Sequence, residues 1–123
     1  MRRLFPALLF LLLPCFLAAQ EFRATISGHV YDASGAGVPN AKIEAINTAN
    51  NEIASATSDP SGSYSVPFLR PGQYRITVSA PGFKQYNREN VTLEVGKTTG
   101  IDISLELGQI TESVNVTADA AVL

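Results

Sequence analysis

The residues of this 123-residue chain that could do chemistry are few and lie far apart. His29 is the only histidine, whereas a zinc site would need several ligands and a catalytic glutamate. Ser34 and Ser61 stand beside glycines, but no base accompanies either hydroxyl, as a nucleophile would require. Asp32 and Asp59 lie among turn formers, where capping a turn is expected and calcium binding would need further carboxylates. We therefore expect no catalytic residue, no metal ligand and no cofactor, and a surface histidine on the first strand.

The C-terminal run from Thr111 to Ala118 alternates in a way that suits binding by strand addition. An extended segment can add to the edge of a partner's sheet, with main-chain hydrogen bonds for affinity and alternate side chains for selectivity. Because Gly108 breaks the preceding strand, we expect the run to lie outside the domain as an accessible tail. The alternative is that Ile110 to Val116 continues the last strand or pairs with its own domain. The candidate partner-binding residues are Thr111, Glu112, Ser113, Val114, Asn115, Val116, Thr117 and Ala118.

Aromatic rings are a second kind of candidate site, since an exposed ring can form a platform for a sugar. Four of them fall at positions predicted to face or cover a core, namely Tyr64, Phe68, Tyr74 and Phe83. Tyr31 and Tyr86 are the better exposed candidates for contact with a glycan. No tryptophan is present to enlarge such a platform.

The elements that must position these residues are organised around the stretch from Thr57 to Phe83. Asp59-Pro60-Ser61-Gly62 fits a type I turn at each place, with Asp first, Pro second and Gly fourth. Pro71-Gly72 predicts a second turn. Between and after the turns, apolar and polar residues alternate, which is typical of strands with one dry and one wet face.

The rest of the chain continues this pattern of short strands separated by turns. Further alternating segments are Ala24–Tyr31, Ala41–Ala45, Glu52–Thr57, Val91–Val95 and Ile101–Leu107, and the polar segment Lys84–Arg88 is expected to be an edge strand. The spacing predicts an all-β, antiparallel sandwich of about seven strands over residues 24–107. The apolar parity of each strand predicts a core of Ile26, Val30, Ile43, Tyr64, Val66, Leu69, Tyr74, Ile76, Val78, Val91, Leu93, Ile101, Ile103 and Leu105.

The first 20 residues have the composition of a secretory signal peptide. Arg2 and Arg3 precede an apolar run that contains Cys15, the only cysteine, and small residues follow it. Of nine basic and eleven acidic residues, removal of the two leader arginines leaves seven and eleven, a formal charge of −4. The scattered charges form no basic patch, which argues against nucleic acid. The mature domain would contain no cysteine and therefore no disulfide, so its core alone must stabilise it after export.

Three motifs strongly resemble the carboxypeptidase regulatory-like domain: I-S-G-H-V-Y-D, V-P-N-A-K-I-E-A and G-S-Y-S-V-P-F-L-R-P-G-Q-Y-R-I-T-V-S-A-P-G-F. The resemblance covers most of residues 25–107. It implies a transthyretin-like (prealbumin-like, Ig-like) sandwich of the carbohydrate-binding-like fold group. The peptidase of the family name is absent, because its zinc ligands are missing, so the resemblance implies a module that does not catalyse.

Residues 108–123 resemble the linker that precedes the plug of TonB-dependent outer-membrane transporters. Thr111 to Ala118 is similar to the TonB box, the run that an energising periplasmic TonB-type protein grips. The resemblances imply a non-catalytic exported module, on the periplasmic face of the outer membrane or secreted, with no transmembrane span in the mature chain. It would be the N-terminal extension of a transporter, either as a truncated fragment or as a small protein that kept this module. The alternative is a stand-alone surface or periplasmic module that binds carbohydrate or protein.

Overall fold

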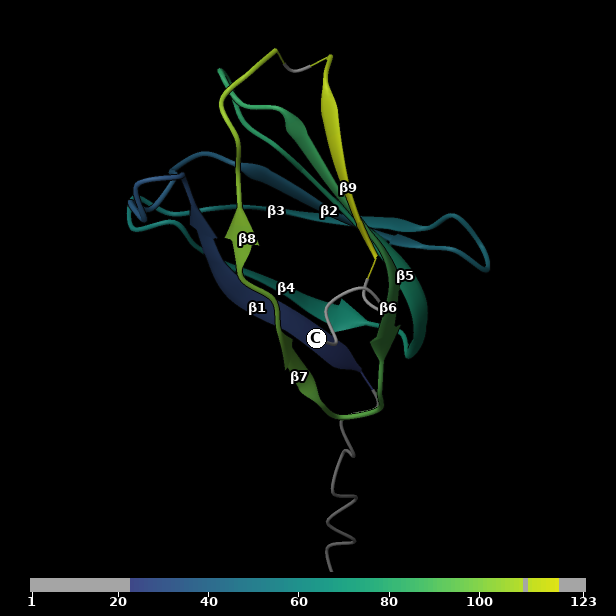
Figure 1. Ribbon diagram of the computed structural model, residues 1–123. Coiled ribbons are helices and arrows are strands. Elements are labelled where there is room, and N and C mark those ends of the chain that lie inside the picture. Colours follow the sequence, from purple (N-terminus) through teal and green to yellow (C-terminus); the bar gives the residue numbers. More distant parts are fainter. Residues whose placement is uncertain (1–22, 110, 118–123) are drawn as a thin grey trace, which may run out of the picture.

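The computed structural model describes residues 23–109 and 111–117, so the predicted signal peptide lies outside the described residues. This part of the chain consists of strands and turns without a helix (Figure 1). The strands are β1 (Ala24–Tyr31), β2 (Lys42–Asn47), β3 (Ile53–Thr57), β4 (Ser63–Leu69), β5 (Gly72–Ser79), β6 (Gln85–Leu93), β7 (Thr98–Gly100), β8 (Ile103–Ser104) and β9 (Ser113–Thr117).

The strands form two sheets that pack face to face as a sandwich (Figure 1). The four-stranded sheet has the order β4-β1-β7, with β8 also paired to β1. The five-stranded sheet has the order β3-β2-β5-β6-β9. The predicted all-β sandwich is confirmed, although parallel pairings of β1 with β7 and β8, and of β6 with β9, make the sheets mixed.

The core lies between the sheets and is formed by the inward parity of each strand. All fourteen residues predicted for it are buried. The core extends further through small residues such as Ala24, Ala41 and Ala45, and the half-buried Phe83 packs against it as the expected lid. The buried Tyr64 and Tyr74 donate their hydroxyls to the carbonyls of Ile101 and Arg70, at 2.5 and 2.8 Å. The two phenols are therefore both packed and hydrogen-bonded.

The turn between β3 and β4 has the geometry that its sequence predicts. The amide of Gly62 donates to the carbonyl of Asp59 at 2.9 Å, and the Asp59 carboxylate accepts the amides of Ser61 and Ser63 at 2.9 Å each. Gly62 has φ of +88°, and a Cβ there would collide with the carbonyl oxygen of Val30. Only glycine meets both conditions without strain.

The most regular alternating run, Ile101–Leu107, does not form the long antiparallel strand that we expected. Ile101, Ile103 and Leu105 are buried as predicted, but Leu107 is exposed. The strands that pair with β1 here are short and parallel to it: β7 just before the run and β8 within it. Between them the Asp102 carboxylate accepts the amide of His29 at 3.0 Å in place of a main-chain carbonyl. Gly28 allows this approach, because a Cβ there would overlap the Ile101 carbonyl.

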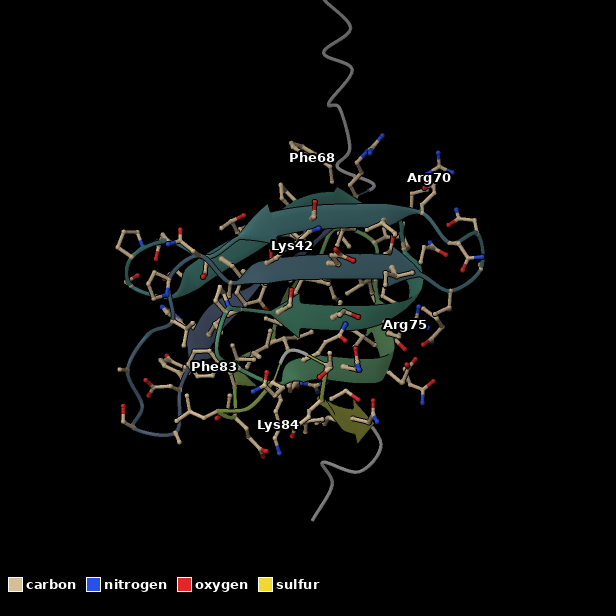
Figure 2. The ribbon with its side chains drawn as sticks, turned by 90° about the horizontal axis from the view of Figure 1, so that it is seen from above. Lys42, Phe68, Arg70, Arg75, Phe83 and Lys84 are labelled. Carbon is tan, nitrogen blue, oxygen red and sulfur yellow. The ribbon has the colours of Figure 1, made fainter. Side chains whose placement is uncertain are left out.

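Lys84–Arg88 and Val91–Val95, expected as two strands, contribute to one strand, β6. A bulge joins them: Tyr74 pairs with Val91, but Ile76 pairs with Arg88. The polar segment is not the edge of the sheet, because β9 pairs with it. Viewed from above, the edges of the five-stranded sheet are β3, near Phe68 and Arg70, and β9, near Lys84 (Figure 2).

Candidate partner-binding strand

The tail that resembles a TonB box is folded into the sheet as β9. Ser113 to Thr117 pair in parallel with Gln85 to Glu89, in register from end to end. Our expectation that this run lies outside the sandwich is therefore wrong, and the alternative of pairing with its own domain is correct. Val114 and Val116 are half-buried on the inner face, and Val116 packs against the core. Burial of their apolar surface, added to the main-chain ladder with β6, stabilises the docked position.

Gly108 has the opposite effect from the one we expected. It ends the preceding segment, but its lack of a side chain also lets the backbone cross the stem of Lys84, where a Cβ would collide. The Gly108 amide donates to the carbonyl of Gly82 at 3.1 Å, and Phe83 forms a bridge with Leu107. These contacts return the chain to the sheet rather than releasing it.

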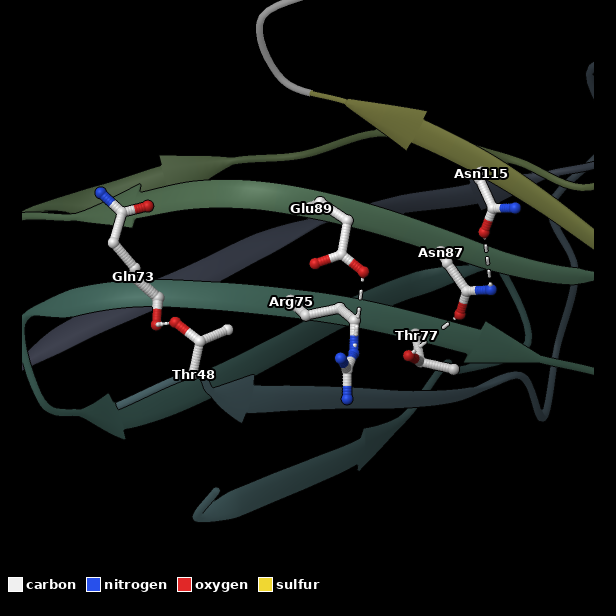
Figure 3. Close-up of polar contacts among 7 residues, drawn as sticks. All are labelled: Thr48, Gln73, Arg75, Thr77, Asn87, Glu89 and Asn115. Atoms are coloured by element: carbon white, nitrogen blue, oxygen red, sulfur yellow. Dashed lines mark hydrogen bonds and ion pairs between the residues drawn. The ribbon is translucent and has the colours of Figure 1, made fainter. Parts of the chain in front are cut away.

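On the outer face of the sheet, polar side chains hold β9 against β6. The Thr77 hydroxyl donates to the Asn87 carbonyl oxygen, and the Asn87 amide donates to that of Asn115, each at 3.2 Å (Figure 3). These two side-chain hydrogen bonds link β5, β6 and β9. In the main chain, the Gln85 N–H donates to the Glu112 carbonyl at 2.8 Å. The side-chain ammonium of Lys84 lies 3.5 Å from the Glu112 carboxylate. These bonds specify the register, while exposed ion pairs contribute little energy.

One edge of β9 remains open in the part of the chain that the structure describes. The main-chain bond from the Gln85 N–H to the Glu112 carbonyl shows which residues of this segment direct their backbone groups toward β6. In a strand, successive amides point in opposite directions within the sheet. Val114 and Val116 therefore direct their backbone groups toward β6, and Ser113, Asn115 and Thr117 direct theirs away from it. An open row of donors and acceptors can pair with another strand.

The remaining candidate partner residues lie on either side of β9. Thr111 and Glu112 are exposed in the turn before it, where the Glu112 amide donates to the Gln109 carbonyl at 2.9 Å. Ala118 lies outside the described residues. The structure thus brings most of the predicted segment together as one strand.

Of the two glycan candidates, Tyr86 is wrongly assigned. Its ring is 7% exposed and belongs to the core, because the bulge in β6 reverses the parity counted back from Val91. Tyr31 is half-buried and stacks on the exposed His29, with ring centroids 5.6 Å apart. His29 lies on the surface of the first strand, as expected.

Sequence reasoning missed Phe68, which we placed facing or covering the core. Its side chain is 68% exposed. The signal was present in the parity of β4: Tyr64 and Val66 are even-numbered core positions, whereas Leu69 is odd-numbered. Such a change of parity within one strand indicates a bulge, here at Pro67 and Phe68.

The turn carboxylates have structural partners rather than ligands. A hydrogen bond from the Ser34 hydroxyl to Asp32 lowers the pKa of that carboxyl, and the Ser61 hydroxyl lowers the pKa of Asp59 in the same way. Among the described residues, no three His, Cys, Asp or Glu side chains gather closely enough to hold a metal ion. Residues 23–109 and 111–117 contain no helix with the length and hydropathy needed to span a membrane.

Comparison with known proteins extends the resemblance of the sequence motifs. The chain is 31% identical over 102 residues to the TonB-dependent transporter Oar of Myxococcus xanthus. The match covers 79% of this chain, but the chain spans only about a tenth of the length of that curated relative (10%).

Solved structures share the fold at low sequence identity. A putative carbohydrate-binding protein from Bacteroides uniformis superposes with a TM-score of 0.55 and 14% identity, over 67% of this chain and 40% of that one. The minor pilin GBS52 of Streptococcus agalactiae superposes with a TM-score of 0.57 and 13% identity, over 73% and 47% of the two chains. At these identities the likeness concerns the sandwich alone. The carboxypeptidase regulatory-like domain model matches residues 25–106, and the chain belongs to this family of non-catalytic regulatory domains.

Proposed function

We propose that this chain is a non-catalytic exported module, from the N-terminal periplasmic extension of a TonB-dependent outer-membrane transporter. The observation that carries the proposal is the match of 79% of the chain to such a transporter. The segment from Thr111 to Ala118 is then the part that a periplasmic TonB-type protein engages. The module has a docking role and carries out no reaction.

The geometry of β9 supports engagement through its open edge. Val114 and Val116 already use their main chain toward β6, so a partner strand meets the backbone groups of Ser113, Asn115 and Thr117. The exposed Ser113 and Asn115 side chains border the same edge. Main-chain pairing supplies affinity, and these side chains select among partners.

Site-directed cross-linking tests this proposal. In a Cys15→Ser background, Ser113→Cys and Asn115→Cys are each given a short bifunctional thiol–amine reagent and a purified periplasmic TonB-type domain. We expect a cross-linked heterodimer from both variants. The matched control is Ser104→Cys, which is exposed on β8 in the other sheet and is expected to remain uncross-linked. Equal yields at all three positions, or none, would contradict the proposal.

A stand-alone module that binds carbohydrate is the second candidate function. It is supported by the stacked pair of His29 and Tyr31, which offers an aromatic surface on β1. Titration with neutral oligosaccharides, followed by the ring resonances of Tyr31, distinguishes it from the transporter proposal. Saturable shifts lost in Tyr31→Ala would favour it, and unchanged resonances would exclude this surface.

A further inference from the structure

Phe68 has a backbone conformation that its side chain disfavours. Its φ is +61°, and the other non-glycine residues with positive φ in the described ranges are all asparagines, which tolerate it. The strain arises at the β4 bulge, where Pro67 and Phe68 together oppose Thr25. The bulge turns the ring to the surface, where it is 68% exposed. Strained residues that persist in a fold often serve a site, and bulges often re-aim a side chain.

A cavity of about 170 Å³ lies beside this ring, at the border between the sheets. Its inner wall includes Leu69, Tyr74 and the small residues Ala45 and Ala54. Since the alanines are short and Phe68 is turned outward, no side chain of residues 23–109 and 111–117 fills the space. The cavity is half open and its lining is mixed, with apolar groups on the inner wall and charged groups at the rim. Its volume is close to the roughly 150 Å³ that holds one benzene ring, so it has room for a single side chain.

The rim of the cavity carries an excess of positive charge. Arg23 and Arg70 line it together with one carboxylate, that of Glu52. A guanidinium nitrogen of Arg23 donates to the Phe68 carbonyl at 3.1 Å, and this bond supports the bulge. The ion pairs found among the described residues involve neither of these two arginines. Both cations are available to a carboxylate of a ligand.

Two strand edges flank the cavity. In the described part of the chain, β3 pairs only with β2, and β4 pairs only with β1. The bulge at Phe68 interrupts the edge of β4, whereas β3 is in regular register over all its five residues. Side chains of a strand added to β3 would alternate between the outer face and the space between the sheets, where the cavity lies.

We propose that the β3 edge, residues 53–57, binds an extended acidic segment of a partner protein. The segment pairs with the β3 backbone, inserts one apolar side chain into the cavity against Phe68, and directs a carboxylate two residues away toward Arg23 and Arg70. This site is distinct from β9 and does not depend on the proposed transporter role. The single-ring volume and the paired cations favour a peptide over a larger ligand.

The test uses the ¹⁵N-labelled chain and the blocked peptide Ac-Thr-Leu-Thr-Asp-Thr-NH₂, in which Leu and Asp share one face. We expect saturable shifts of the amides of Ile53 to Thr57, Phe68 and Arg70. Matched peptides with Asn in place of Asp, or Ala in place of Leu, are expected to bind at least about tenfold more weakly. Equal affinity for the Asn peptide, or shifts centred on β9, would overturn the proposal.

Two variants separate binding from folding. Phe68→Gly removes the ring and relieves the positive φ, so we expect an unchanged or higher Tm together with loss of peptide binding. Ala54→Leu fills the cavity and is expected to block binding while the chain stays folded. Arg70→Gln should weaken binding about tenfold, whereas Arg75→Gln, on the outer face of β5, should not. A lower Tm of Phe68→Gly with binding intact would assign Phe68 a structural role and refute the site.

Other occupants are distinguishable outcomes. Galacturonate oligomers that produce the same shifts, when the peptide produces none, would assign the site to acidic sugars instead. Concentration-dependent dimerisation that Ala54→Leu abolishes, without any peptide binding, would make the partner a second copy of the chain. If the peptide binds only to the Phe22→Ser variant, the occupant of the cavity is the segment of the chain that precedes Arg23. Each of these results contradicts an acidic peptide partner.

Discussion

The two edges of the five-stranded sheet, β3 and β9, have similar lengths and different chemistry. β3 pairs antiparallel with β2 and borders a half-open cavity of mixed lining, with two arginines on its rim. β9 pairs in parallel with β6 and presents amides and hydroxyls outward, while Lys84 near its start lies close to Glu106 and Glu112. If both proposals hold, recognition at β9 relies mainly on main-chain groups, whereas recognition at β3 adds a side-chain pocket. One sheet can thus offer two edges with different selectivity.

The largest expected effect comes from the core beneath the β3 edge. Tyr74→Ala removes a ring that is 3% exposed and a hydroxyl bonded to the Arg70 carbonyl, so it should destabilise the domain by about 3–5 kcal/mol. Val116→Ala, beneath β9, removes a half-buried side chain and should cost about 1 kcal/mol. Urea unfolding of both variants measures the contrast. Equal costs would mean that β9 belongs to the core as firmly as β5.

The turn that leads from β3 to β4 should produce the next largest effect. In Gly62→Val the new side chain must adopt a positive φ and its Cβ collides with the Val30 carbonyl oxygen. The free energy of unfolding should therefore fall by about 2–4 kcal/mol. Gly35→Val is the matched control, because Gly35 has φ of +84° but open space where a Cβ would lie, and should cost about 1 kcal/mol. Thermal melts compare them. A smaller loss for Gly62→Val than for Gly35→Val would show that crowding at this turn is unimportant.

Detachment of β9 should be cheaper and local. Val114→Pro removes an amide directed toward β6 and should release β9 at a cost of about 1 kcal/mol, leaving β3 protected. Asn115→Ala removes only the side-chain bond with Asn87 and should cost about 0.5 kcal/mol. Both variants are compared with the parent chain by hydrogen exchange of the backbone amides in β3, β6 and β9. Loss of protection at β3 after Val114→Pro would show that the two edges are coupled.

The smallest expected effect is a response to acid at the β3 side. Hydrogen bonding from Ser61 lowers the pKa of Asp59 in the folded chain. The ionised form therefore stabilises the fold above the unfolded-state pKa, and this contribution is lost as pH falls through the lowered folded-state pKa, below about pH 4. Asp59→Asn should flatten the acid limb of the stability curve. An unchanged slope would exclude Asp59 as a contributor.

The sequence allowed the fold and core to be predicted because period-two patterning is local. Ile26, Ile43 and Ile76 could be assigned to the core from their own strands alone. Simple alternation assigns Tyr86 and Phe68 wrongly, since each lies at or beyond a one-residue bulge that reverses parity. For Phe68 the change of parity between Val66 and Leu69 was the available signal, whereas no such signal marks Tyr86. The same locality explains the error at β9. Its alternation indicates a strand, but which strand it pairs with depends on the free edge of β6, a tertiary feature.

Hydrogen exchange of four amides in β9 tests the central claim most directly. In the isolated chain, the amides of Val114 and Val116 should exchange slowly, and those of Ser113 and Asn115 quickly. A saturating TonB-type domain should slow Ser113 and Asn115 selectively, while Val114 and Val116 stay protected. If Ser113 and Asn115 continue to exchange quickly in its presence, the open edge of β9 is not the partner-binding site.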